Sequence, residues 1–178
     1  MRENHDLIAF LSGGDRRSLG SSGRVVSLVL ENPAIISGLV DLLTGHDPVV
    51  VMRAADVLEK VQRKLPPSVF TPFRRKLMAL ARTAVQPELR WHLTQMLPHL
   101  MLSKSQRHAL VGILKQYFED RSAIVRVSAL QATVELAKGY DELEHVARDR
   151  LEQALRGSAA ERARARILLS RFFGITAG

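Results

Sequence analysis

Cysteine is absent from all 178 residues of the chain, which excludes disulfide bonds and thiolate chemistry. Aromatic residues are scarce, at 5%, and most apolar residues are Leu, Val, Ala and Ile, a mixture that suits packed helices. No apolar run approaches the roughly 20 residues of a membrane span. The opening stretch MRENHDLIAFLSGG has acids and too short an apolar run for a secretory signal. These absences predict a soluble, cytoplasmic protein with no membrane partner.

Acidic residues are nearly absent from the middle of the chain. Residues 60–115 contain eleven Lys or Arg against one acid, Glu88, whereas the whole chain has a formal charge of +8. Helical spacing arranges part of this block in two stripes, a basic surface made of Arg74, Arg75, Arg82, Lys104, Arg107 and Lys115. Such a surface either binds phosphates or an acidic protein, or is a solvated face that keeps the protein soluble.

Signals for the starts and ends of helices recur along the sequence. Three capping residues stand directly before a proline, at Asn32, Asp47 and Thr71. Three Ser or Asp residues have Gln or Glu three positions later, the spacing of a capping box, at Ser103, Asp141 and Ser158. Three glycines stand where helices should stop, at Gly45, Gly139 and Gly157.

The apolar residues between these signals follow helical spacing, and no strand-like alternation is found. The pattern predicts ten helices in five pairs, over residues 3–11 and 15–31, 33–45 and 48–64, 70–85 and 87–101, 103–119 and 122–138, 141–156 and 158–172. The pair in residues 1–32 is the weakest, because residues 12–23 are rich in Gly and Ser. That segment is either a flexible loop or part of a frayed terminal repeat. Residues 173–178 are a tail.

Four expected second helices align without gaps: DPVVVMRAADVL, QPELRWHLTQML, SAIVRVSALQAT and SAAERARARILL. They resemble the second helix of the HEAT-repeat family, Asp-Pro-x-Val-Arg-x-x-Ala-x-x-x-Leu. The Arg position holds Val51, Arg90, Arg126 and Arg162, at intervals of 39, 36 and 36 residues, and Glu161 occupies an apolar position.

The resemblance covers residues 33–172. It implies a single all-α domain over residues 1–178, a right-handed α-α superhelix (solenoid) of about five HEAT-like helix pairs. In such a stack the first helices line the convex side and the second helices the concave side. The family's Arg, here at positions 90 and 126, usually ties adjacent repeats together through acidic or carbonyl partners.

Trp91, the only Trp, points away from the apolar face of its own helix, because it stands two residues from both Leu89 and Leu93. The repeat phase directs it into a concave groove, whose predicted lining is Met52, Asp56, Trp91, Gln95, Gln131 and Glu135. Trp91 is then either an anchor for a bound partner or a half-buried side chain lying across the adjacent helix.

No cofactor or metal ion is predicted. His92 and His99 would be separated by roughly 10 Å along a helix axis, too far to share one ion. The sequence also has no nucleophile motif and no Gly-rich phosphate loop. Some DNA glycosylases are built of HEAT-like repeats with an Asp and Trp residues in the groove, roles that Asp56 and Trp91 would take. Only the architecture is similar, so this enzyme is our third choice.

The predicted function is therefore non-enzymatic. We expect an interaction or scaffold module that binds a protein or peptide partner through its concave groove and its basic surface. The alternative is a nucleic-acid-binding protein that uses the basic block of residues 60–115. The sequence leaves the oligomeric state and the identity of the partner open.

Overall fold

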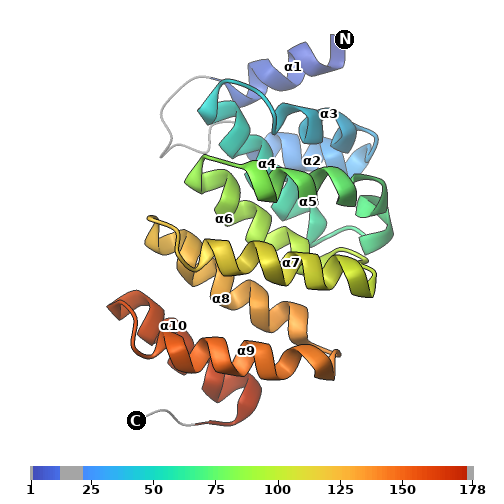
Figure 1. Ribbon diagram of the computed structural model, residues 1–178. Helices are drawn as coiled ribbons and strands as arrows, with labels where there is room; N and C mark the ends of the chain where they lie inside the picture. The colour runs from blue at the N-terminus through green and yellow to red at the C-terminus, as the bar shows by residue number, and fades with distance from the viewer. Residues whose placement is uncertain (1, 13–21, 176–178) are drawn as a thin grey trace. The chain divides into compact units, whose positions relative to one another are not determined.

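We describe a computed structural model of the chain, which covers residues 2–12 and 22–175 (Figure 1). These ranges contain ten α-helices, two short 3-10 helices and no strand, which confirms the expected all-α class. The chain divides into two compact units, Met1–Met96 and Leu97–Gly178. The helix expected over residues 15–31 is seen from Ser22, and residues 15–21 lie outside the described ranges.

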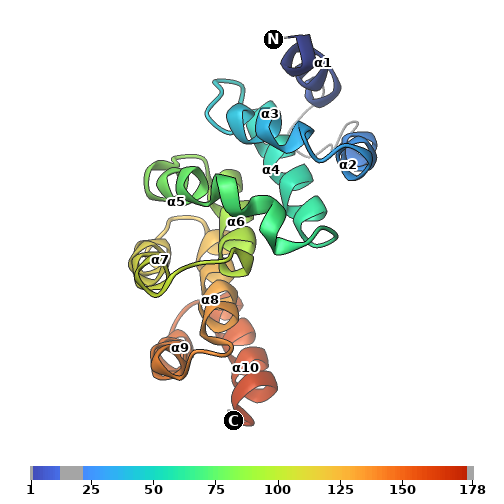
Figure 2. The same ribbon diagram turned by 90° about the vertical axis from the view of Figure 1, so that its right-hand side faces the viewer.

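The first unit is organised around one buried helix. Its elements are α1 (Arg2–Leu11), α2 (Ser22–Glu31), α3 (Ile35–Leu42), α4 (Pro48–Gln62), η1 (Pro67–Phe73), α5 (Arg74–Thr83) and α6 (Pro87–Met96). Figure 2 shows α3 and α5 in one layer and α4 with α6 in the other. Helix α4 packs against α1, α2, α3 and α6, and twelve of its fifteen residues are buried, so it forms the core of this unit.

The second unit repeats this plan. Its elements are η2 (Leu97–His99), α7 (Lys104–Tyr117), α8 (Ala123–Ala137), α9 (Asp141–Ala154) and α10 (Ala159–Phe173). Helices α7 and α9 lie in one layer and α8 with α10 in the other (Figure 2). Helix α8 contacts η2, α7, α9 and α10, and is the central helix of this unit.

Three of the predicted helix starts are confirmed in detail. Asp47 accepts hydrogen bonds from the backbone N–H groups of the second and third residues of α4, at 2.8 and 3.4 Å. Ser103 and Ser158 each begin a complete capping box, with Gln106 and Glu161. Gly139, with φ of 74°, follows the end of α8 in the left-handed conformation that glycine adopts without a steric penalty.

Three predicted helix starts are wrong. Asn32 is not the cap of α3, which begins at Ile35 after Ala34, although the side chain of Asn32 accepts a hydrogen bond from the backbone N–H of Ala34 at 3.2 Å. Thr71 lies inside η1, and α5 begins only at Arg74, because the prolines of this segment favour a 3-10 helix before the α-helix. Asp141 is the first helical residue of α9 and not its cap, a position held by Tyr140. Its carboxylate stands instead in the first turn, where a negative charge stabilises the helix dipole.

The helix expected over residues 87–101 is shorter than predicted. It ends at Met96, and the 3-10 helix η2 follows it. Pro98 explains the change, because it has no N–H to donate to the carbonyl four residues earlier. The α-helix therefore ends at the residue where the first compact unit ends in sequence.

The arginines at the family's Arg position make one recurrent contact. The guanidinium of Arg90 donates to the carbonyl of Ala84, that of Arg126 to Asp120, and that of Arg162 to Gly157, each at 2.7 Å. Each acceptor lies in the turn before the helix that carries the Arg. These carbonyl contacts lie within one pair of consecutive helices, and Arg126 also lies 3.3 Å from the carboxylate of Glu161 on α10, an acidic partner beyond its own pair of the kind that the resemblance implied.

We expect Leu97→Ala to lower the free energy of unfolding by about 2–5 kcal/mol, because Leu97 is fully buried and its loss leaves a cavity. Val85→Ala is the control, since Val85 is 82% exposed and its change should stay within about 0.5 kcal/mol. Urea denaturation followed by circular dichroism measures both. Equal losses in the two variants would contradict the core position of Leu97.

Candidate functional site

A network of polar side chains joins α4 to α6 in the first unit. Its centre is the buried carboxylate of Glu59, whose Oε2 lies 2.7 Å from His92 Nδ1 and accepts a hydrogen bond from Gln95 at 3.0 Å. Arg63 donates to the other oxygen of Glu59 and, at 3.0 Å, to the side-chain carbonyl of Gln95. The burial of this carboxylate is thus compensated by three partners.

Trp91 stands at the edge of this network. Its ring stacks on the ring of His92, with the centroids 4.6 Å apart and an angle of 22° between the planes. Because His92 is buried and held by Glu59, it supports one face of the indole with a ring that is itself anchored. Trp91 itself is only half-buried, so part of this aromatic surface stays accessible.

The other two predicted groove residues of the first unit are not accessible. Met52 and Asp56 are both buried, because α2 and α6 cover α4 from two sides. The carboxylate of Asp56 is paired with Lys60 at 2.6 Å. The accessible side chains on this α4–α6 face are therefore Trp91, Gln95, Lys60 and Arg63.

The predicted groove residues of the second unit form a smaller chain of hydrogen bonds. Gln131 donates to Glu135 at 2.8 Å, and Lys138 pairs with Glu135 at 2.5 Å. Arg164 of α10 reaches the side-chain carbonyl of Gln131 at 3.5 Å. Gln131 and Glu135 are half-buried, so both units carry polar side chains on the helices that the repeat pattern assigned to the concave side.

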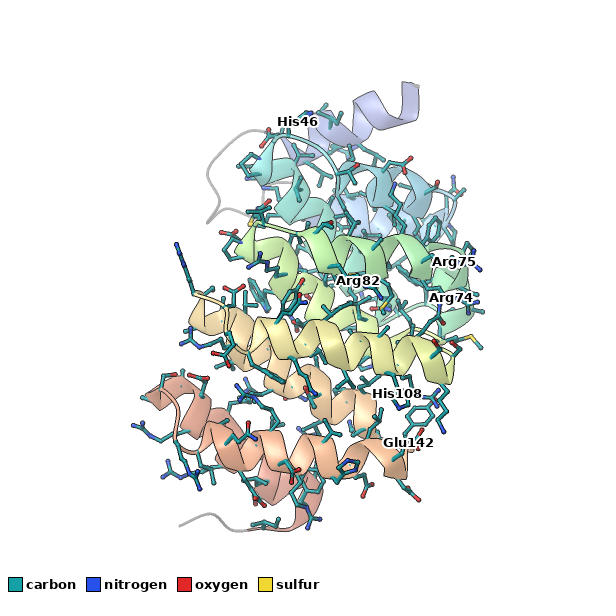
Figure 3. All side chains as sticks on the ribbon, viewed as in Figure 1. His46, Arg74, Arg75, Arg82, His108 and Glu142 are labelled. Carbon is teal, nitrogen blue, oxygen red and sulfur yellow. The ribbon has the colours of Figure 1, made fainter. Side chains whose placement is uncertain are left out.

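Three residues of the predicted basic surface belong to the first unit. Figure 3 shows Arg74 and Arg75 together at the start of α5, apart from Arg82 near its end. Arg75 and Arg82 are exposed and have no ion pair within the part of the chain that the structure describes, whereas Arg74 is half-buried. Lys76, which sequence analysis left out of the surface, pairs with Asp41 at 2.6 Å.

The other three residues belong to the second unit and differ from one another. Lys104 and Lys115 are exposed. Arg107 is largely enclosed, because it donates to the carbonyl of Leu102 at 3.1 Å and lies over the ring of Tyr140 at 3.6 Å. It also pairs with Glu142, labelled in Figure 3, at 3.6 Å. The contacts of Arg107 are therefore mainly within the protein, and its charge is less accessible than those of Lys104 and Lys115.

The charge of Glu142 is favoured by its surroundings. Its pKa is lowered, mainly by a hydrogen bond from its own backbone N–H and further by the positive charges of Lys104 and Arg107, against a smaller opposing effect of burial. This acid lies far outside residues 60–115 in sequence. The basic block is therefore less free of acids in space than in sequence.

A pocket of about 430 Å³ lies between α7 and α9, over α8. Its walls include Lys115, His145 and Arg150, together with the exposed acids Glu119 and Asp149, so positive and negative groups are mixed. The guanidinium of Arg150 lies 4.1 Å from the ring centre of Phe118, and burial lowers its pKa. This pocket was not predicted from the sequence, because its walls come from three helices.

Glu161, at an apolar position of the repeat pattern, has a structural function. Its Oε2 accepts hydrogen bonds from the hydroxyl and the backbone N–H of Ser158, at 2.5 and 3.1 Å, and lies 3.3 Å from Arg126 Nε. Burial raises the pKa of Glu161, but the bonds from Ser158 and the charge of Arg126 outweigh it and lower the pKa overall. The carboxylate thereby links α10 to α8.

Comparison with known proteins identifies no relative: no family model, no curated protein and no solved structure matches the chain. Within residues 2–12 and 22–175, no group of three or more His, Cys, Asp or Glu could hold a metal ion. No described helix is long and apolar enough to cross a membrane. The geometry of the side chains is therefore the basis for any functional assignment.

We expect Glu161→Gln to reduce the acid sensitivity of the fold. Because the pKa of Glu161 is lowered in the folded chain, the ionised carboxylate stabilises the fold above the ordinary value of 4.5, and this stabilisation is lost as the pH falls through the folded pKa. Urea denaturation at neutral pH and at successively lower pH measures the difference between wild type and variant. It should shrink towards acid pH.

The control is Asp149→Asn, which removes an exposed carboxylate from the same unit. Its difference from wild type should change little over the same pH range. A constant difference between wild type and Glu161→Gln at every pH would contradict the ionised contact with Arg126.

Proposed function

We propose that the chain is a HEAT-like right-handed α-α superhelix of five helix pairs, in which α1 with α2, α3 with α4, α5 with α6, α7 with α8, and α9 with α10 are the repeats. The proposal is supported by the arginine-to-carbonyl contact that recurs in the last three pairs. It is also supported by packing within each unit, where the principal contacts join α-helices that are at most three positions apart along the chain.

We further propose that this protein is a non-enzymatic interaction module that binds a protein or peptide partner. The observation that carries this proposal is Trp91, a half-exposed indole that stacks on His92, which is itself held by Glu59. Trp is favoured at the centres of protein interfaces, where one large ring contributes much of the binding energy. A ring that is supported on one face loses less conformational freedom on binding than an unsupported one.

The neighbours of Trp91 suit a peptide more than a small molecule. Gln95 and Arg63 belong to the same hydrogen-bond network as His92, on which Trp91 stacks, and Lys60 directly follows Glu59 on α4. Their amide and cationic groups can pair with peptide backbone and with acidic side chains. In the second unit, Gln131 and Glu135 offer similar groups on α8. A glycosylase-like reaction is less well supported, because Asp56 is buried and paired with Lys60.

Wild-type protein and Trp91→Ala, used as baits in nuclease-treated native lysate, should differ in the proteins that they capture. A protein bound by wild type and lost by the variant would then be purified and titrated against the chain. Trp91 is the only Trp in the sequence, so its fluorescence reports binding at this position directly. We expect a blue shift and weaker acrylamide quenching when the partner covers the ring.

The variant must first be shown to fold. Trp91→Ala should lower the free energy of unfolding by less than Leu97→Ala does, since Trp91 is half-exposed. If the two variants were equally destabilised, or if a partner left the fluorescence of Trp91 unchanged, the anchor function of Trp91 would be wrong.

Nucleic acid is the second candidate partner, and a separate observation favours it. Four side chains of the basic block are exposed and have no ion pair within the described residues, namely Arg75, Arg82, Lys104 and Lys115. Cations outside close ion pairs can replace the counterions of a phosphate backbone, and of these four only Lys104 acts electrostatically on a described acid, the nearby Glu142.

If these cations bind phosphates, the affinity for duplex or single-stranded nucleic acid should fall steeply with salt. Changing all four residues to Glu should abolish binding and leave helicity intact, and base preference should be slight, because no exposed aromatic side chain alternates with them. Fluorescence anisotropy at low and moderate salt measures this. Absence of binding by the folded wild type at low salt would leave these residues as solubility charges.

A further inference from the structure

The exposed surface of α10 is basic and carries no acid. Among the described residues this helix has its main contacts with α8 and α9, and Figure 2 shows no other helix of the second unit beside it. Three arginines are exposed along it, at positions 162, 166 and 171, together with Ile167, which is 55% exposed, and three exposed alanines, at positions 159, 160 and 163. The single acid of α10, Glu161, is buried and paired with Arg126, so it does not offset this charge at the surface.

Arg166 is the arginine of this surface with no structural contact in the described residues. Arg162 holds the carbonyl of Gly157, and Arg171 lies over the ring of Phe172 at 5.4 Å. Arg166 has neither kind of contact, and it stands directly before the exposed Ile167. Arg166 is therefore an exposed cation without an acidic partner in the described residues, and an acidic surface would complement it.

The exposed surface of α9 has the opposite charge. Five acids of this helix are exposed, Asp141, Glu142, Glu144, Asp149 and Glu152, against one exposed arginine, Arg148. Glu144, Arg148 and Glu152 are four residues apart and share one face of the helix. Arg148 lies 5.2 Å from the ring centre of Phe173, the last residue of α10, so this face borders α10.

We propose that the α9–α10 pair is the interface between two copies of this chain. In a twofold contact the same surface meets itself in reverse, so α9 of each copy faces α10 of the other. The acids Glu144 and Glu152 of α9 in each copy then meet the exposed arginines of α10 in the other, and this complementary contact occurs twice. The contact also buries Ile167 and the exposed alanines of α10, which expose apolar area in a single copy.

This proposal does not depend on the proposed function, because Trp91 and its network lie in the other compact unit. It also favours a protein partner over nucleic acid for this surface. A phosphate backbone would be repelled by the acids of α9 and would gain nothing from Ile167. Nucleic acid, or a different acidic protein, is an outcome that the experiment separates from self-association.

Sedimentation velocity over a wide range of protein concentrations should show a monomer–dimer equilibrium that weakens as salt is added. Arg166→Glu should weaken the dimer by at least about tenfold, since it places like charges opposite each other twice. The double variant Glu144→Arg with Glu152→Arg should weaken it similarly. An equimolar mixture of these two proteins should restore a dimer, because each altered surface then meets its complement.

Arg82→Glu is the matched control, because it makes the same charge change at an exposed arginine of the other unit. It should dimerise like wild type, and circular dichroism should show that all variants keep their helicity. Three results would overturn the proposal: a monomer at every concentration in low salt, a dimer indifferent to Arg166→Glu, or a mixture that does not recover. The first would leave the α10 surface to another acidic molecule.

Discussion

The structure depends on the burial of one central helix in each unit. Helix α4 is covered by four neighbours, so even its polar side chains are enclosed and need partners inside the protein. The guanidinium of Arg53 donates to the carbonyls of Leu11 and Ser12 at the end of α1, at 2.8 and 3.2 Å. Gln62 donates to the carbonyl of Met96 at 3.1 Å, at the end of α6. These bonds pair the buried polar side chains of α4 and also hold the ends of the neighbouring helices α1 and α6 against it.

The sequence predicted what local interactions determine. Capping by Asp47, Ser103 and Ser158 involves residues at most three positions away, and each of these starts is found. The contact of Arg53 with α1 joins residues about forty positions apart. The repeat pattern did not predict it, because Arg53 stands outside the repeated Arg position. The burial of the predicted groove residues on α4 was missed for the same reason, distance in sequence. Helical spacing predicts on which face of a helix a side chain lies, but the exposure of that side chain depends on how closely the neighbouring helices approach.

The predicted basic surface changes character because charge counted along a sequence differs from charge exposed on a fold. Lys76 and Arg107 have acidic partners from helices distant in sequence, which removes them from the free charge of the block. The reverse happens on α10, where Glu161 offsets one of four arginines in sequence but is buried. The exposed charge of α10 is therefore more positive than its sequence count, and the predicted basic surface is partly paired.

The α4–α6 network links stability to the presentation of Trp91. Glu59 is buried only because His92, Gln95 and Arg63 all reach it, and two of these partners come from α6. The same bonds that hold α6 against α4 therefore fix the ring of His92 on which Trp91 stacks. Removing the carboxylate would leave buried donors without an acceptor and would also release the indole. Packing and recognition thus share one set of side chains, and a change that frees Trp91 must weaken the contact between the two helices.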